Sequence, residues 1–123
     1  MSDRVLLPIK DGRRFWIVVE THPDLAALNE VIVGAGKVCA LYLASDEHVT
    51  PRKLGTLHLL LESVDLGTLH HECNHVAMEI LRRLTGSKVS VFMEHEETAV
   101  ELSEALFVYL VTKFHPKIVA SCL

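Results

Sequence analysis

Two histidines and a glutamate lie close together near the middle of the chain, at His71, Glu72 and His75. Residues four apart on a helix lie about one turn apart on nearly the same side, so a helix here would direct both imidazoles toward one metal ion. Glu72 would flank that ion, where its carboxylate can take a proton from a metal-bound water whose pKa has fallen to about 7. The spacing therefore predicts metal-assisted hydrolysis.

The neighbouring residues extend this motif. Thr68 stands three positions before the first histidine, the two central residues Cys73 and Asn74 are uncharged, and Val76 and Ala77 follow. The whole stretch resembles the longer helical motif of zinc peptidases, which has Thr or Val before the first histidine and uncharged residues at its centre. That resemblance implies that the bond cleaved is a peptide bond. Two imidazoles and a carboxylate with an open position suit zinc, and the same trio with more open positions would suit non-haem iron.

The helix that must position this motif can be predicted from its sidedness. Helical spacing predicts a helix from about 67 to 85, with an apolar stripe opposite His71 and His75. A solvated helix face that binds no metal would show the same pattern. Cys73 lies on the stripe, so we expect it in the core, and we expect His70 to take no part in the site. The stripe consists of Leu69, Cys73, Val76, Ile80 and Leu84.

A catalytic zinc site usually has a third protein ligand and leaves the fourth position to water or substrate. The sequence predicts a second helix from about 94 to 114, and its residues 105–111 are apolar on nearly all sides, which predicts a buried helix. One stripe of it combines acidic and apolar side chains, although acidic residues also favour a helix N-terminus without binding metal. The stripe consists of Glu97, Glu101, Glu104, Val108 and Val111.

The choice among these glutamates rests on a family resemblance. The chain resembles the gluzincin group of zinc peptidases, whose third ligand is a glutamate on a later helix, followed four residues on by an acidic or amide residue. By that resemblance Glu97 is the third ligand and Glu101 steadies a ligand histidine. The family usually has Asp where this chain has Glu101, so a register with Glu101 as ligand and Glu104 beside it stays open. Residues 66–112 also resemble small phage and prophage metallopeptidases and, more loosely, prophage-type peptidases that cleave repressors.

The remaining segments predict a small sheet. The fold class expected is α+β, with one domain over residues 1–123: a mixed or antiparallel sheet with an N-terminal hairpin, packed on the metal-binding helix and a C-terminal helix. The resemblance implies a minimal zincin-like domain. Expected strands are residues 5–10 and 13–20, joined through Asp11 and Gly12, then 38–44 and 56–62, with a short helix at 24–32.

The strand at residues 56–62 has two interpretations. In the zinc peptidases that the chain resembles, an edge strand beside the metal helix pairs with extended substrate through its free main-chain groups. Residues 56–62 are the candidate for that strand. An interior position in the sheet is the alternative.

Composition limits the classes of partner and compartment. The net charge of −4 and the absence of a basic run argue against a nucleic-acid partner. The N-terminus opens no long apolar run, so we expect neither export nor a membrane span. The three cysteines are an odd number, and Cys39 and Cys73 lie in apolar stretches, which predicts reduced thiols in a cytoplasmic protein.

The sequence thus predicts a zinc-dependent peptidase in which Glu72 activates water and passes its proton to the leaving amine. Its substrate would be a peptide or a specific protein, with Tyr109, His95 or His115 stabilising the oxyanion. The alternatives are a non-enzymatic regulatory or binding protein on a degenerate metallopeptidase fold and a structural protein with a chance motif. The apolar C-terminal helix is also a candidate homo-oligomer interface.

Overall fold

The computed structural model describes residues 2–8, 12, 14–31, 39–61, 63–85 and 92–122, and the side chains of residues 31, 92–94 and 115–122 lie outside that description. It confirms the predicted α+β class. The described elements are β1 (Ser2–Pro8), β2 (Arg14–His22), α1 (Leu25–Val31), β3 (Ala40–Ala44), β4 (Lys53–Leu60), α2 (Leu66–Thr85) and α3 (Phe92–Cys122).

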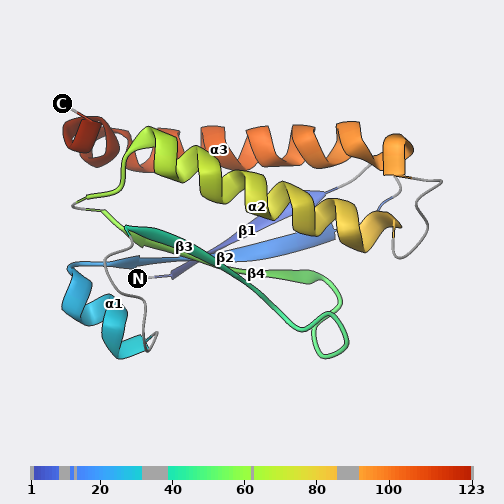
Figure 1. Cartoon of the computed structure of the whole chain (residues 1–123), viewed down its shortest axis with the longest axis horizontal. Coiled ribbons are helices and arrows are strands. Elements are labelled where there is room, and N and C mark those ends of the chain that lie inside the picture. Colours follow the sequence, from blue (N-terminus) through green and yellow to red (C-terminus); the bar gives the residue numbers. More distant parts are fainter. Residues whose placement is uncertain are drawn as a thin grey trace.

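The four strands form one mixed sheet in the order β1-β2-β4-β3. Strands β1 and β2 are antiparallel, as are β3 and β4, so the sheet consists of two hairpins. The hairpins meet at a parallel seam between β2 and β4. Helices α2 and α3 lie side by side over one face of the sheet, and α1 lies on the other face (Figure 1). The hairpin predicted around Gly12 is confirmed, and Gly12 has the positive φ of 92° that such a turn favours.

The core lies between the sheet and the pair of helices α2 and α3. Alternate residues of a strand point to opposite faces, so every second residue of β1, β2 and β4 is directed at the helices. Each fully buried side chain of this size contributes about 1.5–3 kcal/mol by leaving water. The cluster includes Leu7, Phe15, Ile17, Val19, Leu57 and Leu59 from the sheet and Leu69, Val76, Ile80, Leu106 and Leu110 from the helices.

Helix α2 begins close to the predicted residue because an aspartate caps it. The Asp65 carboxylate accepts a hydrogen bond of 2.7 Å from the Thr68 amide, and this bond holds the pKa of Asp65 below its usual value. The predicted apolar stripe is confirmed, with Leu69, Cys73 and Ile80 buried against the sheet and α3.

Of the two interpretations of residues 56–62, the interior position is confirmed: this strand is β4, which has β2 on one side and β3 on the other, so the edge strand beside α2 is β3. Two predictions about α3 were wrong. Helix α3 is buried on one side only, since Val108 is 61 % exposed while Leu106 and Leu110 are buried. It also continues past Phe114 to Cys122, because a helix can bend at a proline such as Pro116 rather than end there.

Strand β4 approaches β3 so closely at Gly55 that no side chain fits there. A Cβ on Gly55 would collide with the carbonyl oxygen of Leu43 and with the ring of Tyr42. We therefore expect Gly55→Ala to lower the free energy of unfolding by about 3 kcal/mol. Urea denaturation followed by circular dichroism measures this.

Gly67→Ala is the matched control, because a Cβ there meets only an oxygen of Asp65 at 3.4 Å, which is an ordinary contact. Alanine is also the better helix former, so this change is expected to alter stability by no more than about 1 kcal/mol. Equal stability of the two variants would show that β3 and β4 can separate at little cost.

Candidate metal centre

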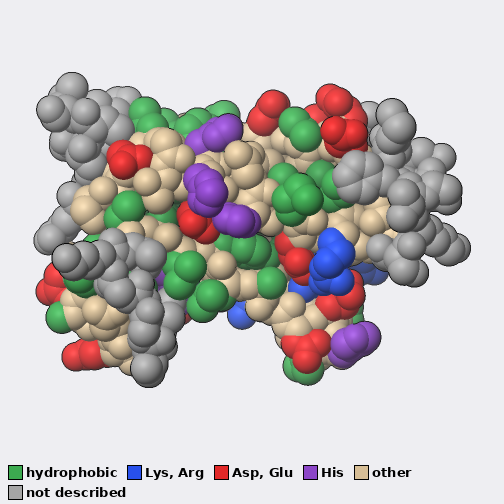
Figure 2. All heavy atoms as spheres, in the orientation of Figure 1, with side chains coloured by type: hydrophobic (Ala, Val, Ile, Leu, Met, Phe, Trp, Pro, Cys, Tyr) green, Lys and Arg blue, Asp and Glu red, His purple; other side chains and the backbone are tan. Residues whose placement is uncertain are grey.

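Helix α2 brings the side chains of His71 and His75 together on its exposed surface. Their Nε2 atoms are 3.1 Å apart, and the rings are nearly perpendicular, at 82°. A zinc ion about 2.1 Å from each nitrogen would separate neighbouring ligand atoms by roughly 3.0–3.4 Å. The pair therefore has the spacing that one shared metal ion requires. Figure 2 shows histidine side chains gathered over α2 on the side that faces β3.

Glu72 lies beside this pair but is buried. Its carboxylate accepts a 2.9 Å hydrogen bond from the main-chain amide of Tyr42 in β3. One ligand atom from each of His71, Glu72 and His75 lies within 4.8 Å of the other two. The helix thus supplies two accessible imidazoles and one carboxylate that the neighbouring strand holds in place.

The outer edge of β3 runs next to this group. Main-chain hydrogen bonds from the Ser45 amide to the Leu54 oxygen and from the Leu60 amide to the Cys39 oxygen lie at the two ends of the β3–β4 ladder. Antiparallel residue pairs alternate between hydrogen-bonded and non-hydrogen-bonded. The main-chain N–H and C=O groups of Ala40, Tyr42 and Ala44 therefore point away from β4. The Tyr42 amide on this outer edge is the one that donates a hydrogen bond to the Glu72 carboxylate. Strand β3 therefore has the position relative to the motif helix that was predicted for residues 56–62.

A groove of about 510 Å³ separates β3 from α2. On its β3 side, the Tyr42 phenol donates a 2.6 Å hydrogen bond to the carbonyl oxygen of Leu54. Burial, followed by the nearby Glu79 carboxylate, raises the pKa of Tyr42, so the phenol keeps its proton. The groove is lined by Leu41, Tyr42, Ala44, Glu72, His75, Met78, Glu79 and Arg82.

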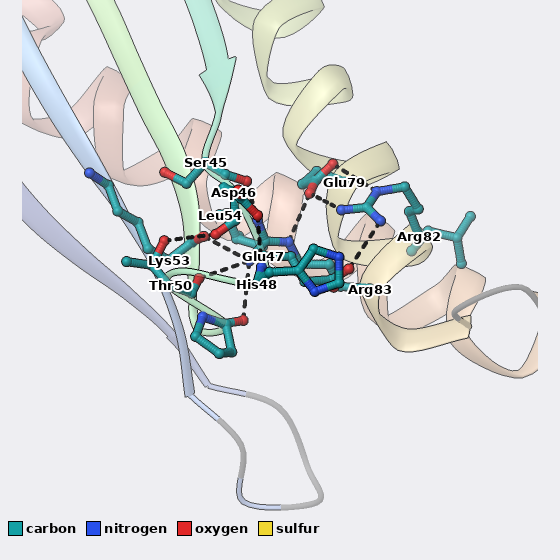
Figure 3. A network of polar contacts seen from close by, with 12 residues as sticks. Ser45, Asp46, Glu47, His48, Thr50, Lys53, Leu54, Glu79, Arg82 and Arg83 are labelled. Carbon is teal, nitrogen blue, oxygen red and sulfur yellow. Dashed lines mark hydrogen bonds and ion pairs between the residues drawn. The ribbon is translucent and has the colours of Figure 1, made fainter.

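Arg83 fixes the far end of the groove (Figure 3). Its guanidinium is buried and donates to the main-chain oxygens of Ser45 at 2.8 Å, Pro51 at 3.1 Å and Lys53 at 2.7 Å. It also donates to the carboxylate of Glu79 at 2.8 Å. One side chain of α2 therefore holds both ends of the loop between β3 and β4, and with it the position of β3.

The structure does not bring Glu97, Glu101 or Glu104 into the group formed by His71, Glu72 and His75. All three are exposed on α3. Each precedes a buried residue of α3 by two positions, namely Ala99, Ser103 and Leu106. Two positions correspond to about 200° around a helix, so Glu97 and Glu101 lie on the side of α3 away from its packed stripe. Glu104 instead borders a groove of about 390 Å³ between α2 and α3, which His75 and Glu72 do not line.

The three predicted oxyanion donors lie away from the groove as far as it is described. The hydroxyl of Tyr109 is on α3, where the Lys113 ammonium donates to it at 3.4 Å. His95 is near the start of α3 and does not line the groove, and the side chain of His115 lies outside the described part. Three other polar residues line it, Tyr42, Glu79 and Arg82, and they were missed because none belongs to the motif.

Cys73 and His70 take the positions expected from the sequence. Cys73 is buried in the core, and burial together with the Glu72 carboxylate raises the pKa of its thiol to about 12. A thiol that holds its proton so firmly is a poor metal ligand. His70 points toward α3, where its ring meets the edge of Phe107 with the centroids 5.6 Å apart.

The sheet also gathers basic side chains that are scattered in the sequence. On the face opposite α2 and α3, the Arg4 guanidinium lies 4.1 Å from the ring centroid of Trp16, and the Lys53 ammonium lies 5.6 Å from it. Arg14 and Arg52 line the same shallow groove of about 560 Å³. A search for basic runs cannot detect this group, because its members come from β1, β2, β4 and the loop before β4.

Comparison of the chain with protein-family models, with curated proteins and with solved structures gives no match. None of the helices described here has the length and apolarity that crossing a membrane would need.

Proposed function

We propose that the chain is a zinc-dependent hydrolase that cleaves a peptide bond in the groove between β3 and α2. The observation that carries this proposal is the position of His71, Glu72 and His75 beside the outer edge of β3, which has no strand neighbour among the described elements. Glu72 already occupies the Tyr42 amide of that edge, so a peptide would pair with the main-chain groups on either side of it. A free edge can pair with an extended peptide through main-chain hydrogen bonds. A peptide paired with β3 would have its backbone next to the two imidazoles.

In this proposal His71 and His75 bind the metal and Glu72 acts as the general base. Zinc, when bound, would acidify a water molecule and polarise the carbonyl group of the substrate. Glu72 takes the proton from the attacking water and returns it to the leaving amine. The Tyr42 amide orients the Glu72 carboxylate through one oxygen, which leaves the other free for proton transfer.

The site on α2 offers two imidazoles, whereas most catalytic zinc sites have three protein ligands. No acidic residue of the described part of α3 joins them, so we expect the affinity for zinc to be modest. Zinc must therefore be supplied when the site is tested. The substrate is proposed to be a specific protein or peptide, because an open groove that cleaved any extended chain would damage other proteins.

Metal binding tests this proposal directly. Native protein without a metal-binding tag is dialysed against micromolar zinc, and bound metal is measured by elemental mass spectrometry. His71→Ala and His75→Ala are each expected to bind one zinc ion fewer per chain than the native protein, because each removes half of the chelating pair.

His70→Ala is the matched control, since His70 is a neighbour on the same helix that contacts Phe107 instead. It is expected to bind as much zinc as the native protein. If His71→Ala and His75→Ala also match the native protein, the site on α2 does not bind zinc.

A non-enzymatic binding protein is the second candidate function. It is favoured by the hydrogen bond between Glu72 and the Tyr42 amide, because that bond gives Glu72 a structural role without any catalysis. In that case the groove beside β3 would hold a partner segment that is not cleaved. Zinc binding without hydrolysis of any peptide would support this function.

A further inference from the structure

A second group of side chains that could bind a metal ion lies on the face of the sheet opposite α2 and α3. Glu20 and His22 are two residues apart on β2, so their side chains leave the sheet on the same face. His58 on β4 is the register partner of Glu20 and leaves on that face too. Thr21, which lies between Glu20 and His22 in β2, points to the opposite face, toward α2 and α3. Three potential ligands thus meet across the parallel seam between the two hairpins.

This group is largely enclosed. Both histidines are buried, and the side chain of Glu20 is 36 % exposed. Helix α1 contacts β2 and β4 on this face of the sheet (Figure 1). Leu28 of α1 and Leu60 of β4 are buried but do not belong to the main core cluster. The two imidazoles therefore lie in a small second core, and the glutamate lies on its open side.

The distances in this group match those between ligands of one metal ion. His22 Nε2 is 2.9 Å from His58 Nδ1, and that same Nδ1 is 3.3 Å from an oxygen of Glu20. An ion about 2.1 Å from its ligands separates neighbouring donor atoms by about 3.0 Å at right angles and about 3.4 Å in a tetrahedron. All three donor atoms lie within 4.8 Å of one another.

Hydrogen bonding alone satisfies this arrangement poorly. His58 Nδ1 is close to both His22 Nε2 and the Glu20 carboxylate. If Nδ1 carries a proton, it can donate well to only one of these two acceptors. If it carries none, its lone pair faces a carboxylate oxygen, which repels it. A cation between the three groups removes the conflict, because all three lone pairs can then point at it.

We propose that Glu20, His22 and His58 bind a divalent transition-metal ion, zinc or ferrous iron, which ties β2 to β4. Two imidazoles and one carboxylate suit both ions, since this ligand set occurs in zinc sites and in the three-ligand sites of ferrous iron. The ligands stand on interior strands, so little order has to be created on binding. The enclosure by α1 favours a structural role over catalysis.

The test uses the double variant His71→Ala/His75→Ala, which lacks the candidate site on α2. It is dialysed against micromolar zinc in air and, separately, against ferrous iron without oxygen, and bound metal is measured. About one ion of one of these metals per chain is expected. Addition of the metal should also raise the midpoint of thermal unfolding by about 5 °C or more, because the ion binds only the folded state.

Two further changes in that background locate the ion. Glu20→Gln keeps the shape of a half-exposed side chain and should weaken binding by at least about tenfold, and His58→Gln should abolish it. His48→Gln, in the exposed loop before β4, is the matched control and should change nothing. The proposal is overturned if the double variant binds neither metal, or if its metal survives both Glu20→Gln and His58→Gln.

The outcomes for the two sites are separable. A native protein that binds one ion and keeps it in the double variant supports this second site and argues against the site on α2. A native protein that binds one ion and loses it in the double variant does the reverse. Two ions in the native protein and one in the double variant support both.

Discussion

Glu72→Gln is expected to keep zinc but to lower the rate of peptide hydrolysis by roughly a thousandfold, the scale of a general base. Glutamine has the shape of glutamate, and its amide oxygen can still accept the hydrogen bond from the Tyr42 amide. It cannot take a proton from water at neutral pH. The measurement starts from zinc-loaded native protein and a peptide library analysed by mass spectrometry, and kinetics then follow on a peptide that is cleaved.

Two controls separate catalysis from structure in this experiment. Glu97→Gln changes an exposed glutamate of α3 outside the metal group and should leave the rate unchanged. Glu72→Ala removes the acceptor for Tyr42 as well, so it should also reduce stability, by about 1–2 kcal/mol. A rate for Glu72→Gln within tenfold of the native rate would exclude Glu72 as the base. Absence of any cleavage by the native protein would exclude the peptidase.

Arg83→Met is expected to lower the free energy of unfolding by about 4 kcal/mol, a large part of the stability of a domain of this size. The change leaves the loop oxygens of Ser45, Pro51 and Lys53 without their buried donor. The Glu79 carboxylate keeps only its pair with the exposed Arg82. Each such oxygen costs roughly 1–3 kcal/mol when it is buried without a partner. Urea denaturation measures the loss.

The adjacent arginine provides the comparison. Arg82 also pairs with Glu79, but its side chain is 53 % exposed, and that of Arg83 is 1 % exposed. Exposed ion pairs contribute about 0–1 kcal/mol, so Arg82→Met should be nearly neutral. If the two methionine variants unfold at similar urea concentrations, the buried network does not hold β3 in place.

Local sequence signals were sufficient to predict most of the elements. The Asp11-Gly12 turn predicted the first hairpin, and the spacing of Leu69, Cys73 and Ile80 predicted α2 and its buried side. The strand order could not be predicted, because β4 is inserted between β2 and β3 by long-range packing. That insertion makes β3 the edge strand beside α2.

The candidate site could be predicted only within one helix. The proximity of His71 and His75 follows from helical geometry, so the sequence was enough. The orientation of Glu97 depends on which side of α3 packs against α2, and that side carries the buried Leu106 and Leu110. Ser103 lies on it too and donates to the carbonyl oxygen of Cys73. Helical periodicity predicted that the glutamates share one stripe of α3, but it could not predict whether that stripe faces α2.

The parallel seam also has a consequence for how the chain folds. Each hairpin joins segments that are neighbours in the sequence, whereas His22 and His58 at the seam are 36 positions apart. Closing a longer loop costs more entropy, and distant contacts slow folding. The two hairpins can form on a timescale of about 1–10 μs each. We therefore expect the pairing of β2 with β4 to be the slow step in forming the sheet.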